Sequence, residues 1–174
     1  MKYLLLILLF LFSLINMEVK AQEMIELKNS ASDKIIIKLR FLNGSKSDPE
    51  GKEGLTYTTA SLITQGGTGD LSFSDIQDMI YPMAASYYSS VDKEVSIFTF
   101  SVHKDWLDKF YPVIKGLILN PSFKEEDFNR VKVNQQNYVD QVIRASSDEE
   151  YSKKALEHFL YRGTNFEHMV EGKS

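Results

Sequence analysis

The 174-residue sequence contains no cysteine, no basic run and no apolar stretch long enough to cross a membrane. Without cysteine, neither a disulfide framework nor a lipid-modified cysteine is possible, so the folded chain depends on its apolar core. A net charge of −4 with no basic face gives no support for nucleic-acid binding. A chain of this length accommodates one domain.

The start of the chain has the pattern of a secretory signal. Lys2 precedes the apolar run Tyr3–Ile15, which spans roughly 20 Å as a helix, whereas a hydrocarbon core is about 30 Å thick. Val19-Lys20-Ala21 then supplies the small residues that a signal peptidase recognises. We interpret Met1–Ala21 as a cleaved signal and expect a periplasmic or extracellular protein. A short uncleaved anchor is the alternative.

The remaining sequence predicts an α+β domain with a mostly antiparallel sheet and helices packed on one face. Alternating or β-branched residues predict strands at Met24–Lys28, at Lys34–Leu42 as a central strand, and in a hairpin formed by Ala85–Ser90 and Glu94–Val102. Helical spacing and caps predict five helices: one from Glu53 to the Gly66–Gly69 stop, one from a Ser74 or Asp75 cap to about Met83, one from Asp105 to Asn120, one at Glu125–Arg144 and one at Asp148–Leu160.

Several short segments then resemble one family. They are Gly51–Leu55, the Gly66–Thr68 helix stop, Ile118–Phe123, Glu125–Lys132 and Phe159–Gly172. Their order and spacing are similar to those of the first homologous domain of the insulinase/pitrilysin-type zinc metallopeptidases. The resemblance covers most of the chain after residue 34. It implies the insulinase/pitrilysin-like, metallohydrolase-type fold.

In active members, this resemblance implies the motif H-x-x-E-H on the first helix. Two histidines at i and i+4 share one helical face and bind one zinc ion. The intervening glutamate is the general base for the zinc-bound water. A glutamate on the long helix, about seventy-five residues later, completes three protein ligands and leaves one open position.

None of these four residues is present here. The alignment places Tyr57 and Ser61 at the histidines, Ala60 at the general base and Tyr138 at the third ligand. We therefore predict no catalytic residue, no metal site and no cofactor, and we retain Tyr57, Ser61 and Tyr138 as peptide-cleft candidates. A replacement zinc site built from Glu53, Asp140 and a histidine is the alternative.

An aromatic cluster offers a second candidate for peptide contact. Tyr87, Tyr88, Phe98 and Phe100 lie on the two arms of the predicted hairpin. They are interpreted as alternating sheet residues with one face under the helices. A peptide-binding aromatic wall is the alternative.

The resemblance implies a function as well as a fold. Family domains pair around a peptide, so this chain is interpreted as a non-catalytic domain that contributes peptide cleft and partner contacts to a zinc-bearing peptidase subunit. We expect residues 24–174 to form a peptidase-like N-terminal domain, incomplete at its C-terminus. Its partner is then that subunit or a missing C-terminal domain. The alternatives are a free-standing exported peptide-binding module and an active metalloendopeptidase fragment with unrecognised ligands.

Overall fold

The computed structural model describes residues 23–172, so the predicted signal at Met1–Ala21 lies outside the described residues. The chain divides into two compact units, Met1–Ala31 and Ser32–Ser174. In the first unit, residues 23–31 contain neither helix nor strand, and the predicted strand at Met24–Lys28 is therefore wrong. Alternation gives a segment the side-chain pattern of a strand, but not the partner strand that its backbone groups require.

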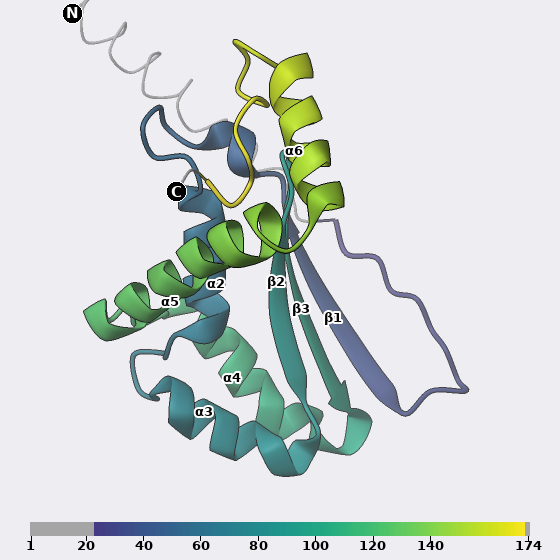
Figure 1. Ribbon diagram of the computed structural model, residues 1–174. Helices are drawn as coiled ribbons and strands as arrows, with labels where there is room; N and C mark the ends of the chain where they lie inside the picture. The colour runs from purple at the N-terminus through teal and green to yellow at the C-terminus, as the bar shows by residue number, and fades with distance from the viewer. Residues whose placement is uncertain (1–22, 173–174) are drawn as a thin grey trace, which may run out of the picture. The chain divides into compact units, whose positions relative to one another are not determined.

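The second unit contains a three-stranded antiparallel sheet in the order β1-β3-β2 (Figure 1). The strands are β1 at Lys34–Phe41, β2 at Ser86–Val91 and β3 at Ser96–His103. The predicted hairpin is confirmed as β2 and β3. The central position predicted for the first strand is wrong, because β3 lies in the centre and β1 at an edge. The side chain of Ile36, in the middle of β1, is accordingly 60% exposed.

Within residues 23–172, five α-helices accompany this sheet, and the ones that contact it cover one face, which confirms the predicted α+β architecture (Figure 1). They are α2 at Leu55–Gln65, α3 at Phe73–Ile80, α4 at Leu107–Leu119, α5 at Glu125–Asn137 and α6 at Asp148–Leu160. Short 3₁₀ turns are η1 at Ser45–Ser47, η2 at Tyr81–Met83 and η3 at Lys104–Trp106, and the π-helical segment η4 at Tyr138–Arg144 directly follows α5.

Two helix predictions differ from the structure in detail. The cap of α3 is Ser72, not Ser74 or Asp75, and it forms a capping box in which Ser72 and Asp75 bond each other's backbone N–H groups. The helix ends at Ile80, since Pro82 has no N–H to continue the ladder. The long helix does run from residue 125 to 144, but its last seven residues are π-helical.

The core lies between the sheet and its helices, and Phe100 of β3 is at its centre. This side chain is 1% exposed. Its ring stacks on Tyr87 with centroids 6.1 Å apart and meets the edge of Phe110 of α4 at 6.4 Å. The other core residues include Ala60, Ile76, Ile80, Phe98, Val102, Val113, Ile114 and Leu117. Within residues 23–172, no helix is long and apolar enough to cross a membrane.

Candidate functional site

The first helix, α2, is anchored at its N-terminus by a carboxylate. Asp48 Oδ2 accepts the N–H of Gly54 at 2.8 Å, and Oδ1 accepts the N–H of Thr56 at 2.9 Å. The Asp48 side chain is 1% exposed. A negative charge at this position satisfies otherwise unpaired N–H groups and complements the helix dipole. The sequence analysis missed this residue, although an aspartate in the loop before a predicted helix is the signal that identifies it.

The other end of α2 is held by the predicted glycine stop. The N–H of Gly66 donates to the carbonyl of Leu62 at 2.8 Å, and the N–H of Gly67 donates to Asp127 of α5 at 3.4 Å. Arg130 donates to Asp127 at 2.6 Å and also to the carbonyl of Gln65. These contacts fix α2 against the start of α5.

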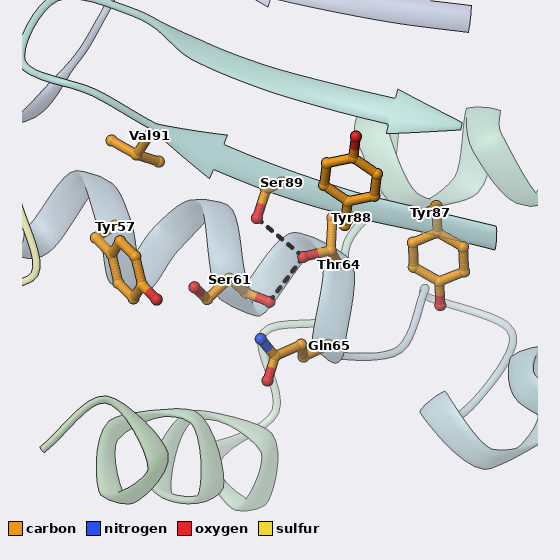
Figure 2. A pocket seen from close by; sticks show the side chains of 8 residues that line it. All are labelled: Tyr57, Ser61, Thr64, Gln65, Tyr87, Tyr88, Ser89 and Val91. Atoms are coloured by element: carbon orange, nitrogen blue, oxygen red, sulfur yellow. Dashed lines mark hydrogen bonds between the residues drawn. The ribbon is translucent and has the colours of Figure 1, made fainter. Parts of the chain in front are cut away.

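A hollow of about 230 Å³ lies between α2 and β2, and eight residues line it (Figure 2). Two of the three predicted cleft residues, Tyr57 and Ser61, are among them. The others are Thr64, Gln65, Tyr87, Tyr88, Ser89 and Val91, so the lining contains no charged side chain. Because β2 is an edge strand, one side of its backbone has no strand partner within residues 23–172.

Hydroxyl groups join the two walls of this hollow. The Oγ atoms of Thr64 on α2 and Ser89 on β2 are 3.1 Å apart, as the dashed line in Figure 2 shows. Gln77 of α3 donates to the hydroxyl of Tyr87 at 3.1 Å. Tyr87, Phe98 and Phe100 belong to the core side of the sheet, which supports their interpretation as ordinary sheet residues. Tyr88 is 55% exposed and is the aromatic residue of this group that solvent reaches most easily.

The third predicted cleft residue, Tyr138, does not line the hollow. It begins η4 and is 42% exposed. It nevertheless lies near Tyr57: burial raises the pKa of Tyr57, and Glu171 and Tyr138 raise that pKa further. Tyr57 and Tyr138, at one of the histidine positions and at the third-ligand position, therefore interact electrostatically.

The buried phenol of Tyr87 leads to a testable prediction about how stability depends on pH. Burial raises its pKa to about 12, although the hydrogen bond from Gln77 acts in the opposite direction. An unfolded tyrosine has a pKa near 10. Since the folded pKa is higher, the contribution of Tyr87 to stability is complete below pH of about 10 and is lost as the pH rises toward about 12. An ultraviolet titration should show one phenol ionising last, and Tyr87→Phe should remove that phase. If the late phase survives in Tyr87→Phe, the assignment is wrong.

The residues at the four motif positions do not fit a zinc ion. Ala60, at the general-base position, is 3% exposed and packs in the apolar core. A neutral tyrosine is a poor zinc ligand because its pKa is near 10. In residues 23–172, no three histidine, cysteine or acidic side chains gather into a possible metal site.

The replacement ligands are also dispersed. Asp140 pairs with Arg144 at 3.4 Å, His168 lies 3.8 Å from Asp48, and His158 lies 3.4 Å from Glu167. Glu53, Asp140 and a histidine therefore form no common site among the described residues.

Comparison with known proteins identifies the family and the fold. The model of the family "Insulinase (Peptidase family M16)" matches residues 24–173. A peptidase M16 inactive domain from Pseudomonas fluorescens aligns with a TM-score of 0.69 and 17% identity, over 80% of this chain and 34% of that chain. A protease from Helicobacter pylori aligns with a TM-score of 0.73 and 13% identity, over 82% of this chain and 34% of that chain.

The present chain thus spans about a third of the length of these two solved structures. No curated protein matches the sequence significantly. The family match covers nearly the whole chain after residue 23, and the fold and the preserved α2 frame agree with it. The protein therefore belongs to the insulinase family, peptidase family M16, and its sequence contains no H-x-x-E-H motif.

Proposed function

We propose that this protein is a non-catalytic peptidase domain that holds an extended peptide along β2, beside α2, for a zinc-bearing homologous subunit. The observation that carries this proposal is the coincidence of an unpaired strand edge with an adjacent hollow. An extended peptide that joins a sheet edge gains affinity from backbone hydrogen bonds and specificity from pockets for its alternate side chains. Both elements meet at β2.

The lining of the hollow indicates the kind of side chain that fits. Its eight residues carry hydroxyl, amide, aromatic and aliphatic groups and no charge. An ionised peptide side chain would lose hydration there without gaining a counter-ion. We therefore infer a preference for peptides with neutral, partly apolar residues. Exposed Tyr88 points to the opposite face of β2 from Tyr87 (Figure 2), where it supplies an aromatic contact to the side chains that a paired peptide presents on that face.

The proposal also assigns the chemistry to a partner. Family M16 domains pair with homologous subunits, and the four motif positions of this chain lack ligands for zinc. We infer that the zinc ion and the attacking water belong to that partner. This chain then contributes one wall of the peptide cleft and contacts to the peptide. The signal-like segment at residues 1–21 supports action after export, in the periplasm or outside the cell.

A peptide-binding assay on the isolated protein tests this function. A fluorescent, neutral, extended peptide should bind and remain intact, and the dialysed protein should retain no stoichiometric zinc. Tyr88→Ala should weaken binding about five- to tenfold, as truncation of an aromatic contact residue commonly does. Tyr111→Ala is the matched control, because Tyr111 of α4 is 56% exposed and lies outside the hollow. One retained zinc ion together with peptide cleavage would refute the proposal, as would equal effects of the two substitutions.

A further inference from the structure

The last helix, α6, presents its apolar side chains to solvent. None of its thirteen residues is buried. Leu156, Phe159 and Leu160 are each more than half exposed, and Tyr151 is 51% exposed. An amphipathic helix at a protein surface normally turns its apolar stripe inward. In α6, by contrast, the apolar stripe faces solvent.

Polar contacts hold the helix in this orientation. Lys154 pairs with Glu171 at 3.3 Å, and both side chains are largely buried. His158 lies 3.4 Å from Glu167. After α6 the chain returns toward the start of α2 (Figure 1), where Gln135 of α5 donates to the carbonyl of Glu171 at 2.7 Å. The polar side of α6 thus faces its own domain, and no part of residues 23–172 covers the apolar side, which is free to contact a partner.

We propose that this partner is a second copy of the chain, with the two α6 helices packed antiparallel about a twofold axis. The charges on the outward side are self-complementary. Asp148 begins α6 and Arg162 lies in the turn directly after it, each seven residues from Ala155. When two antiparallel helices cross at Ala155, Asp148 of each copy therefore lies beside Arg162 of the other. Neither residue has an ion pair within the described part of the chain.

The other features of this face fit the same arrangement. Ala155 is small, which allows two helices to approach closely at the crossing point. The Arg162 guanidinium lies over the Phe159 ring, 5.7 Å from its centroid, so the positive charge is held next to the apolar stripe. A twofold interface needs such self-complementarity.

Size-exclusion chromatography with light scattering, run over a range of protein concentrations, tests this surface. The wild-type protein should form dimers. The double variant Leu156→Glu/Phe159→Glu should weaken dimerisation by at least about tenfold, because it places two charges in an apolar contact. Leu119→Glu is the matched control, since Leu119 at the end of α4 is 70% exposed and outside α6. Circular dichroism should show that all variants are folded.

A charge exchange tests the antiparallel arrangement separately. Asp148→Arg and Arg162→Asp should each weaken the dimer, and the double variant should restore it. A protein that stays monomeric at every concentration would overturn the proposal. So would a dimer that is insensitive to the α6 substitutions, or an α6 surface that binds only a zinc-bearing subunit. Failure of the double variant to recover would overturn the antiparallel geometry. None of these outcomes bears on peptide binding at β2.

Discussion

Replacing Ala60 with glutamate is expected to lower the free energy of unfolding by about 3–5 kcal/mol, the usual cost of an uncompensated buried charge. Ala60 is 3% exposed and packs among the core residues beneath the sheet. A glutamate there also needs more volume than the methyl group it replaces, and overpacking adds to the loss. Within residues 23–172, no cluster of histidine, cysteine or acidic side chains forms a metal site that could stabilise the carboxylate.

The neighbouring position gives a matched control for this experiment. Thr59 is on the same turn of α2 but is exposed, so Thr59→Glu should change the free energy of unfolding by about 0.5 kcal/mol or less. Urea unfolding of both variants measures the difference. Equal stability of the two variants would show that α2 is not packed as described. The result also shows whether Ala60, at the general-base position of the family motif, now serves as a core residue.

Truncating Phe100 to alanine is expected to lower the free energy of unfolding by about 3–5 kcal/mol, as large-to-small changes in a core do. Phe100 is 1% exposed, and its ring contacts both Tyr87 and Phe110. It therefore joins the hairpin to α4, and the cavity left behind would be lined by rings that cannot easily collapse.

Ile36→Ala is the control for this second prediction. Ile36 belongs to the same sheet but is 60% exposed, so its truncation should cost about 0.5 kcal/mol or less. Thermal and urea unfolding of the two variants decide the matter. A loss at Ile36 as large as that at Phe100 would place the core on the wrong face of the sheet.

The sequence predicted the parts of the fold that local patterns determine. The Gly66–Thr68 stop and the β2–β3 hairpin depend on residues close together in the chain, and the structure confirms them. The position of β1 in the sheet depends instead on which strands meet in space. KIIIKLRF looks like a central strand, because β-branched residues stand at both inward and outward positions, and its edge position could not be read from that pattern.

The candidate site was predictable to a similar extent. The register of the lost zinc motif identified Tyr57 and Ser61, and both line the hollow beside β2. It also identified Tyr138, which lies near Tyr57 but outside that hollow. The aromatic cluster had already singled out Tyr88, whereas the contribution of Ser89 arises from its contact with Thr64 of α2, which local patterns do not show. Asp48 was missed because it caps α2 from the preceding loop, several residues before the usual N-cap position.

The central claim is that an extended peptide pairs with β2 and is not cleaved, and hydrogen exchange measured by mass spectrometry tests it most directly. The protein should be compared with and without the neutral peptide, and the peptide mass should be followed in the same samples. The account predicts slower exchange at Ser86–Val91, no change at the opposite edge strand Lys34–Phe41, and an intact peptide. Protection at β1 in place of β2, or a peptide cut by the protein alone, would contradict it.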